Sequence, residues 1–396
     1  MRQTTQTLSS EEARRVALYA QGLLGPRPNG GVSAMLRRLG GVQLDTIAVL
    51  ARSHELVAYA RHGAIRRARI EREYWGKGST TFEYWSHAAC LLPLEDWPAY
   101  GFKRRASRAR GKRWHVLVDH EQSCRDVVTR LREDGPLTAK DLGGAKRGGT
   151  WWDWSEIKIA AEWLIDTGDL VCRERRGFQR VYDLAQRAIP SELMDQEWSD
   201  EECALRLVNA AGRALGVATE ADLAVYHGVP RKLVRQVMDG TELTAVVVDG
   251  WKDPAFVAPS ALEVLTTRVH GRSVLISPFD SLMWYRDRAE RLFGIRHRLE
   301  AYTPKAKRKY GYFAMPVLGG AKVVGLVDPG RRGDCLVAKQ VTLQTRDAPR
   351  HVARALGEAA SWVGCQRILV ERVDPPERRP ELEAHLAAQS GVVDVR

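Results

Sequence analysis

The stretches DGPLTAKDL, residues 134–142, and LIDTGDLV, residues 164–171, decide the expected fold of this chain. Ahead of the first stretch, apolar residues recur at helical spacing between residues 124 and 131, and Gly135 ends that helix. Thr138 is a natural N-cap for a short second helix over residues 137–142. The pattern therefore predicts two helices separated by a tight turn.

A third helix and a hairpin complete this unit. Ser155 opens the helix, and Gly168 ends it in the left-handed conformation that helix ends favour. Residues 170–175 and 179–184 then read as two strands joined by a short turn. Three helices followed by a two-stranded wing predict a winged helix, a fold that binds DNA in some proteins and other proteins elsewhere.

A second copy of the pattern covers residues 200–257. Its first helix is followed by a second helix that Thr219 caps and by a third over residues 230–238. Residues 243–248 and 255–258 would form the wing. The chain is therefore expected to carry winged helices in tandem.

The amino-terminal region gives a third copy. Ser9 or Ser10 caps a first helix, and Glu12 is placed as a capping box from Ser9 requires. A short helix over residues 33–39 and a long one over residues 46–61 follow.

From about residue 262 the pattern changes to alternating strands separated by glycine turns. Strands are expected over residues 273–277, 312–318, 321–328 and 335–345, then a helix over 348–363 and a strand over 367–371. The fold class predicted is α+β, with winged helices over residues 1–117, 118–195 and 196–262 and a β-rich domain over residues 263–396.

The charge balance points to a polyanionic partner. The 396 residues include 61 Lys and Arg against 49 Asp and Glu, a formal net charge of +12. Basic proteins bind nucleic acid strongly because each phosphate contact releases counterions. Basic residues cluster at 66–69, 103–113 and 305–309, although each cluster alone is also typical of a solvated surface.

Other classes of protein are disfavoured. No run of 18 apolar residues exists and the first ten residues lack a signal-peptide core, so a cytoplasmic, nucleoid-associated location is expected. Six scattered cysteines without CxxC spacing predict reduced thiols and no metal site. Phosphate-loop, dinucleotide, zinc-protease and serine-hydrolase motifs are absent, so no cofactor is expected.

The segment GGVQLDTIAVLARSHELVAYARHG, residues 40–63, carries a pair of residues suited to chemistry. In extended backbone, Gln43 and Asp45 project to one side while Leu44 faces the core. A fixed carboxylate stabilises a sugar oxocarbenium cation and accepts a proton from water, and an amide holds that water. The alternative is structural, with Asp45 or Thr46 capping the helix that follows.

Several blocks resemble the winged-helix DNA glycosylase family that includes YcaQ/AlkX and AlkZ. They occur in family order over nearly the whole chain: VQLDTIAVLARSHELV, YWSHAACLLPLEDWP, SPFDSLMWYRDRAERLFGIRHRLEAYTPKAKRKYGYFAMPVL and GLVDP. The resemblance implies tandem winged helices with a carboxy-terminal β domain. It also implies an enzyme of base excision repair that removes alkylated purines from double-stranded DNA and unhooks interstrand crosslinks.

The family's catalytic element is a Gln-apolar-Gln or Gln-apolar-Asp triplet, and here it is Gln43-Leu44-Asp45. By the resemblance, Asp45 is the base or cation stabiliser and Gln43 positions the water. The Asp form resembles YcaQ/AlkX and implies broader activity than antibiotic-specific resistance. Because the chain would carry three winged helices, a monomer wrapping one duplex is expected.

Further candidates for DNA contact have alternative interpretations. His54 lies on an apolar helix face and is more simply a core histidine, whereas His87 follows an aromatic stretch and approaches the lesion in the functional interpretation. Other candidates for phosphate contact come from two basic runs and are Arg104, Arg105, Lys305, Lys307, Arg308 and Lys309. The competing class is a non-catalytic winged-helix transcription regulator, which would bind DNA without excising a base.

Overall fold

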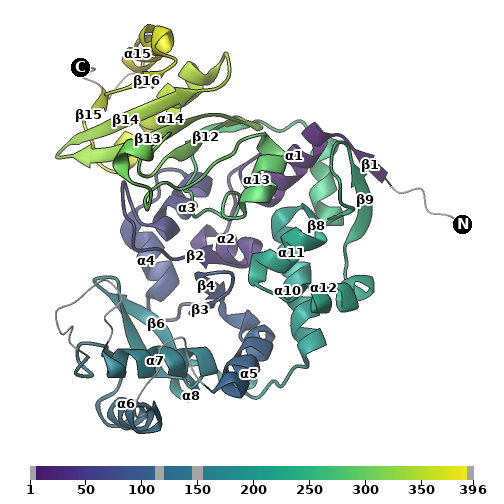
Figure 1. Ribbon diagram of the computed structural model, residues 1–396, viewed down its shortest axis with the longest axis vertical. Coiled ribbons are helices and arrows are strands. Elements are labelled where there is room, and N and C mark those ends of the chain that lie inside the picture. Colours follow the sequence, from purple (N-terminus) through teal and green to yellow (C-terminus); the bar gives the residue numbers. More distant parts are fainter. Residues whose placement is uncertain (1–5, 112–119, 145–154, 390–396) are drawn as a thin grey trace, which may run out of the picture.

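The structure, a computed structural model, describes residues 6–111, 120–144 and 155–389. Across these described ranges, helices and four β-sheets form a mixed α/β molecule, which confirms the predicted fold class. Figure 1 shows the sheet within residues 272–374 at the top, α6 (His120–Asp134) and α7 (Glu156–Thr167) at the bottom and the amino-terminal region between them. The domain boundaries proposed from the sequence stay a prediction.

The amino-terminal region consists of helices around a small three-stranded sheet of order β2-β4-β3. Ser9 caps the first helix as expected, because Ser9 Oγ accepts a hydrogen bond from Glu12 N at 3.2 Å and the Glu12 carboxylate accepts one from Ser9 N at 2.8 Å. The elements are β1 (Gln6–Leu8), α1 (Ser10–Ala20), α2 (Gly31–Leu39), β2 (Val42–Gln43), α3 (Ser53–His62), α4 (Arg67–Trp75), β3 (Thr81–Trp85), β4 (Ala89–Pro93), the 3-10 turns Leu94–Asp96 and Pro98–Tyr100, and α5 (Gly101–Arg110).

The long helix predicted over residues 46–61 is wrong in its first half. Residues 46–52 are turns and bends, and α3 begins only at Ser53. Ile47 N donates a hydrogen bond to Asp45 Oδ1 at 2.8 Å, which closes a turn where the helix was expected to start. Leu50 is buried in the core although its backbone is not helical. The apolar residues at helical spacing are therefore there for packing and do not mark a helix.

The second unit has the predicted outer helices and hairpin, and its sheet has the order β5-β7-β6. Ser155 Oγ accepts a hydrogen bond from Lys158 N at 3.3 Å, and Gly168 ends the helix with φ +82°. The elements are α6 (His120–Asp134), β5 (Leu137–Thr138), α7 (Glu156–Thr167), β6 (Leu170–Arg176), β7 (Gln179–Leu184), α8 (Ala185–Ala188) and α9 (Ser191–Met194).

The short helix predicted over residues 137–142 does not form. Leu137 and Thr138 instead pair with β7, which uses their backbone for the sheet. Thr138 Oγ1 accepts a hydrogen bond from Asp141 N at 3.3 Å, and Asp141 Oδ2 accepts one from Thr138 N at 3.0 Å. The capping pattern in the sequence is therefore present, but it closes a turn.

The third unit follows the predicted order of helices and wing. Thr219 caps the second helix, with Thr219 Oγ1 accepting a hydrogen bond from Asp222 N at 3.3 Å. The sheet has the order β1-β9-β10-β8, so the amino-terminal strand adds to this wing in parallel, a pairing that the sequence analysis missed. The elements are α10 (Asp200–Leu215), β8 (Val217–Thr219), α11 (Glu220–His227), α12 (Arg231–Val237), the 3-10 turn Met238–Gly240, β9 (Thr244–Val248), β10 (Ala255–Val257) and the 3-10 helix Pro259–Leu265.

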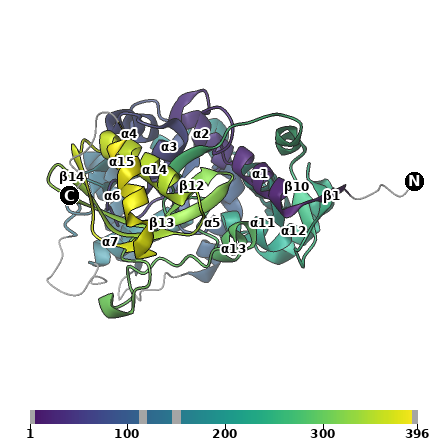
Figure 2. The same ribbon diagram turned by 90° about the horizontal axis from the view of Figure 1, so that it is seen from above.

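The carboxy-terminal region is built on the predicted strands. They form a sheet of order β11-β12-β13-β14-β15, and β16 pairs with β14. Helix α14 contacts β11 to β15, and Figure 2 shows this layer from above. The elements are β11 (Arg272–Leu275), α13 (Arg286–Phe293), the 3-10 turn Lys305–Lys307, β12 (Met315–Gly320), β13 (Lys322–Arg332), β14 (Cys335–Leu343), α14 (Ala348–Trp362), β15 (Arg367–Val370), β16 (Val373–Asp374), the 3-10 turn Pro376–Arg378 and α15 (Arg379–Ala387).

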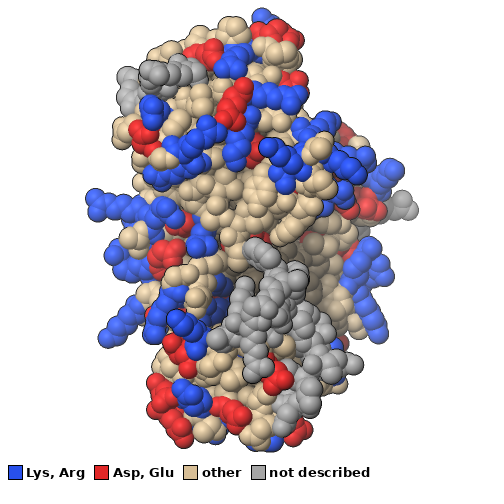
Figure 3. Space-filling model, turned by 60° about the vertical axis from the view of Figure 1, so that its left-hand side comes forward, with Lys and Arg blue, Asp and Glu red and all other residues tan. Residues whose placement is uncertain are grey.

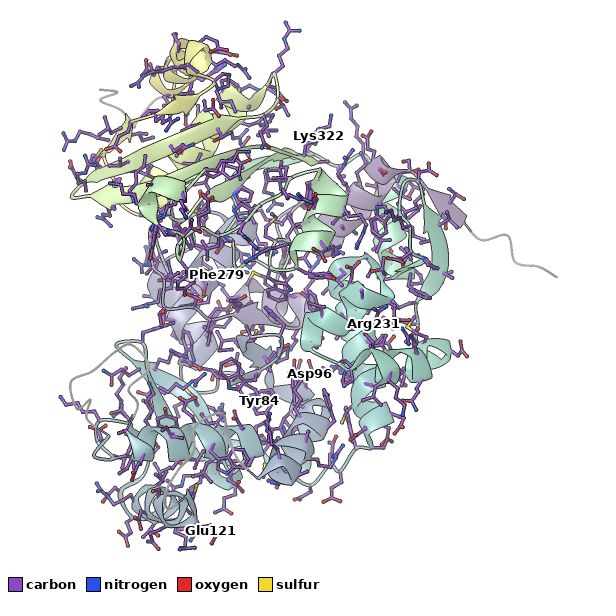
Figure 4. All side chains as sticks on the ribbon, viewed as in Figure 1. Tyr84, Asp96, Glu121, Arg231, Phe279 and Lys322 are labelled. Carbon is purple, nitrogen blue, oxygen red and sulfur yellow. The ribbon has the colours of Figure 1, made fainter. Side chains whose placement is uncertain are left out.

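Buried contacts join the amino-terminal region to the rest of the chain. One hydrophobic core contains residues from α1, α3 and the carboxy-terminal sheet. Arg61 on α3 makes a bidentate ion pair with Asp280 at 2.6 and 2.9 Å, and both side chains are fully buried. Asp96, labelled in Figure 4, pairs with Arg206 of α10 at 2.7 Å. These contacts hold α3 and β2 in a fixed place.

All six cysteines lie in the described ranges and are unpaired thiols. Within those same ranges, no group of three or more His, Cys, Asp or Glu residues is arranged to hold a metal ion. Every described helix is too short or too polar to cross a lipid bilayer.

Candidate active site

The Gln43-Leu44-Asp45 segment is extended and continues the edge of the small amino-terminal sheet. Gln43 pairs with Cys90 of β4, and Leu44 N donates a hydrogen bond to Ala89 O at 2.8 Å. Val42 and Leu44 are buried in a small core, whereas Gln43 and Asp45 are half-buried. This alternation places Gln43 and Asp45 on one face of the strand, as the period of two requires.

The start of α3 is tied to this segment by one hydroxyl group. Ser53 Oγ donates a hydrogen bond to Gln43 O at 2.7 Å and accepts one from Asp45 N at 3.0 Å. Asp45 was expected to lie directly before a helix, but seven residues separate it from α3, and Arg52 occupies the N-cap position. Ser53 therefore fixes the backbone on both sides of Leu44, a role that spacing alone gave no reason to expect.

The electrostatic setting of Asp45 is unusual for a carboxylate in a basic protein. Burial raises the pKa of Asp45, and hydrogen bonds from Ile47 N and Thr46 N act in the opposite direction. Among the ion pairs of the described residues, none includes Asp45. The carboxylate is therefore partly desolvated, and within the described part of the chain it makes no ion pair with a cationic side chain.

Asp45 lies in the wall of a cavity of about 660 Å³ between the amino-terminal region and the second unit. This volume lies within the range of about 300–1,000 Å³ typical of small-molecule sites. Figure 3, in which the left-hand side of Figure 1 comes forward, shows Lys and Arg gathered at the left and right margins of the molecule. The described lining residues are Leu44, Asp45, Thr46, Trp85, Ala89, Ala139, Lys140, Gly144, Ser155, Lys158, Glu162, Arg175, Phe178, Gln179, Arg180 and Tyr182.

A buried ionic cluster holds the β6–β7 hairpin against β3 and so forms one side of the cavity. Glu83 accepts hydrogen bonds from Arg175 at 2.6 Å and from Arg180 at 3.0 Å, and Tyr182 OH donates one to Glu162 at 2.8 Å. Burial opposes ionisation of Glu83, but Arg175 and Arg180 outweigh it and lower the pKa of its carboxyl. The only sequence signal was a glutamate inside the strand TFEYW.

The tip of that hairpin carries Phe178, which has a φ of 68° although it is not a glycine. Its ring lies between the guanidinium groups of Arg52 and Arg175, at 3.8 and 4.3 Å from the ring centroid. It also stacks on His54 with centroids 5.8 Å apart. Phe178 thereby joins the hairpin to the start of α3, a contact that the sequence analysis missed.

His54 is a core residue rather than a DNA contact. Its side chain is fully buried, and His54 Nε2 lies 2.8 Å from Glu71 Oε1. Its assignment to DNA binding is therefore wrong, and the simpler interpretation from the apolar helix face is confirmed.

His87 lies beside the triplet. His87 Nε2 is 3.1 Å from Gln43 Oε1, and its ring packs on Trp284 with centroids 3.7 Å apart. Burial and the positive charge of Lys103 lower the pKa of His87 to about 3. His87 thus has a specific partner in the structure, the amide of Gln43. Its approach to the lesion stays a prediction.

The first basic run lies mostly on helix α5 (Gly101–Arg110). Arg104 is buried, its guanidinium donates a hydrogen bond to Trp97 O at 2.9 Å and lies 4.1 Å from the Trp97 ring centroid. It cannot reach a phosphate from the interior, so its assignment to DNA contact is wrong. Arg105 is exposed and pairs with Asp200 at 2.5 Å. Residues 112 and 113 lie outside the described ranges.

The second basic run forms a 3-10 turn between α13 and β12. Lys305, Lys307 and Lys309 are exposed, as phosphate contacts must be. Arg308 is half-buried and its Nε donates a hydrogen bond to Thr303 O at 2.8 Å, so it shapes the turn. DNA binding by this run stays a prediction.

The fold and the site place the chain in a known structural class. The structure matches that of the Streptomyces sahachiroi DNA glycosylase AlkZ with a TM-score of 0.63 and 19% sequence identity, covering 99% of this chain and 100% of that one. At this identity the match establishes the shared fold. This chain therefore has the fold of AlkZ. The half-buried carboxylate of Asp45 described above lies within that fold.

The sequence profile described as "DNA glycosylase AlkZ-like" matches residues 36–362, which include the triplet, the cavity and α14. This chain belongs to the AlkZ-like DNA glycosylase family. It is therefore a DNA glycosylase that acts on DNA, and the alternative of a non-catalytic regulator is disfavoured.

Proposed function

We propose that this protein is a monofunctional glycosylase that removes N7-alkylated purines and unhooks interstrand crosslinks made through such bases. One observation carries the proposal: the half-buried carboxylate of Asp45 faces a cavity and has no cationic partner among the described side chains. A sugar that loses its base passes through an oxocarbenium-like cation, which is the partner that this carboxylate lacks.

The proposed reaction needs water as its only co-substrate. The bond between the sugar carbon C1′ and the purine nitrogen breaks, and its electron pair leaves with the base. Because an N7-alkylated purine is already cationic, it departs neutral without a general acid. Water adds to C1′, and its proton passes to the Asp45 carboxylate and then to solvent. The products are the alkylated base and an abasic site.

The cavity beside Asp45 is suited to a bulky substituent on the base. Trp85, Phe178 and Tyr182 supply aromatic surface, and Lys140 and Lys158 supply positive charge for the DNA backbone. A crosslinked base cannot be rotated into a closed pocket, because it remains joined to the other strand. We therefore infer that the lesion is approached from a groove, with its adduct lying in this cavity.

The Asp form of the triplet supports the broader, YcaQ/AlkX-like branch of the family and a role in base excision repair. The sequence predicts three winged helices that follow one another in a single chain. That arrangement supports a monomer that contacts one duplex with several units.

The central test uses a duplex containing N7-methylguanine, with alkali to cleave at the abasic site. We expect the wild-type protein to produce strand cleavage at the lesion. Asp45→Asn should lower the single-turnover rate by about 100-fold or more, the size of effect seen when one charge-stabilising group is removed. Asp195→Asn is the matched control, because Asp195 is exposed and distant in sequence from the triplet.

Two results would contradict the proposal. One is sequence-selective binding without cleavage by the wild-type protein, and the other is an Asp45→Asn rate equal to that of Asp195→Asn. Release of the free base rather than a covalent protein adduct on borohydride treatment would support the monofunctional reaction.

Substrate size is tested separately with Trp85→Ala. We expect its rate on a bulky aromatic N7 adduct to fall about ten-fold, while its rate on N7-methylguanine stays within about two-fold, because one aromatic stacking contact is worth about 1–3 kcal/mol. Tyr302→Ala is the control, since this side chain is 86% exposed and lies outside the cavity lining. Equal losses of rate on both substrates would show that the adduct does not lie in this cavity.

A further inference from the structure

His87 lies at the end of the β3–β4 hairpin, directly across from Gln43. Ser86 N donates a hydrogen bond to Ala88 O at 2.9 Å, which closes the hairpin around His87. Lys103 Nζ donates to Ser86 O at 2.7 Å and so anchors the hairpin to α5. Because Gln43 pairs with Cys90 on β4, the imidazole reaches the amide within the same small sheet.

The hydrogen bond between His87 and Gln43 has a defined direction. With a pKa of about 3, the imidazole is neutral at physiological pH and carries one N–H. Gln43 Oε1 only accepts, so its contact with His87 Nε2 is a hydrogen bond in the tautomer whose proton lies on Nε2. His87 Nδ1 then faces Cys90 Sγ at 3.9 Å, and burial raises the pKa of that thiol to about 12, so the thiol keeps its proton to donate.

The ring of His87 is held from a distant part of the chain. Trp284 follows β11 in the carboxy-terminal region and packs on the imidazole with centroids 3.7 Å apart at 36°. Tyr226 of α11 packs on Trp284 in turn, with centroids 5.1 Å apart. The position of the imidazole is therefore set by three regions that are separate in sequence.

The hydrogen bond to His87 also determines which group of the Gln43 amide remains free to contact the substrate. Because Gln43 Oε1 is bonded to His87, the Gln43 NH₂ group is the end left for the substrate, and among the described residues the side chain makes no hydrogen bond other than that to His87. A fixed NH₂ donates to the oxygen of a bound water. Both O–H bonds of that water are then available, and one of them can donate to Asp45.

We infer that His87 is a positioning residue for the glycosylase reaction, which holds the Gln43 amide in the one orientation that presents its NH₂ to the attacking water. The inference rests on the proposed function, since it assigns a task within that reaction. It also replaces the expected role of His87 as a direct DNA contact.

The test is a double-mutant cycle in single-turnover excision of N7-methylguanine, with Kd for the same duplex measured in parallel. His87→Ala should slow excision about 10–100-fold, as expected for a misplaced reacting group, with Kd within about two-fold of wild type. Gln43→Ala and the Gln43→Ala/His87→Ala double variant should react at equal rates, because His87 acts only through Gln43.

Two further variants separate positioning from packing. His87→Gln supplies an amide N–H near the place of Nε2 and should recover about ten-fold of the lost rate. His87→Leu keeps apolar volume against Trp284 and should stay as slow as His87→Ala. This pair also carries the test if His87→Ala does not fold, which thermal unfolding would show.

Three outcomes overturn the inference: a weakened Kd with an unchanged rate in His87→Ala, rate losses that multiply in the double variant, or a His87→Gln rate no higher than that of His87→Leu. Failure of the proposed function is distinct, because the wild-type protein itself would then release no N7-methylguanine.

Discussion

Asp45 and Glu83 are two carboxylates beside one cavity, and their surroundings are opposite. Glu83 is buried and contacts two arginines, Arg175 and Arg180, which lower the pKa of its carboxyl. Asp45 is half-buried, its hydrogen-bond donors among the described residues are backbone N–H groups, and its pKa is raised. Among the described residues, the charge of Glu83, which holds the hairpin against β3, is thus compensated by two arginines, whereas Asp45 makes no ion pair.

This difference is consistent with the role proposed for Asp45 as the carboxylate that stabilises a cationic sugar. An arginine beside Asp45 would stabilise its charge in the resting state and weaken its attraction for a cationic sugar. Arg175 and Arg180, which line the cavity, are instead paired with Glu83 and Glu162. The ionic cluster therefore both positions the hairpin and keeps its cations away from Asp45.

The comparison is tested most strongly by Glu83→Gln. Removing this charge leaves Arg175 and Arg180 buried with less compensation, and we expect the free energy of unfolding to fall by about 3–5 kcal/mol. Urea denaturation followed by circular dichroism measures this, with Asp195→Asn as the unaffected control. A loss below about 1 kcal/mol would mean that the cluster is not a structural element.

The exposed lysines of the second basic run, which lie outside the cavity lining, extend the comparison to surface charges. Replacing Lys305, Lys307 and Lys309 together by Gln should reduce the slope of log K against log salt by up to about 2.7, at about 0.9 per phosphate contact. Binding of undamaged duplex between 50 and 200 mM salt measures the slope. The charge-matched control replaces Lys252, Arg268 and Lys322, and an equal slope change in both variants would show a net-charge effect only.

The pH dependence of excision tests the part of Asp45 in this contrast with Glu83. The reaction proposed above needs the ionised carboxylate, so the rate should fall about ten-fold per pH unit below the pKa of Asp45, which lies above its ordinary value. His87 contributes no step between pH 5 and 8, because its pKa is about 3. A rate that rises on acidification would contradict the role of Asp45 as the base.

The smallest expected effect is on the stability of Asp45→Asn. A carboxyl whose pKa is raised by folding binds its proton more tightly in the folded state, so stability falls as pH rises from the unfolded pKa through the folded pKa. At neutral pH the Asn variant should therefore be more stable, by less than about 1 kcal/mol after solvent screening. Thermal unfolding at pH 7 and at pH 3.5 checks that the difference shrinks on acidification. A destabilised variant at pH 7 would assign Asp45 a structural role.

Local signals in the sequence predicted most helices and strands because capping and alternation act between near neighbours. The Ser9 and Thr219 caps, the hairpin after Gly168 and the carboxy-terminal strands all form as expected. The errors at residues 46–52 and 137–142 arose where a turn or a strand used the same capping residues that a helix would have used.

The sequence by itself determined the triplet Gln43-Leu44-Asp45, the face that Gln43 and Asp45 share and the family to which the chain belongs, because strand alternation and motif order are properties of the linear chain. Tertiary structure alone decided which arginines pair with Glu83 and which side chain contacts the Gln43 amide. Glu83 meets Arg175 across 92 residues, and His87 meets Trp284 from another region. Such partners are chosen by packing between distant segments, and no spacing rule reports them.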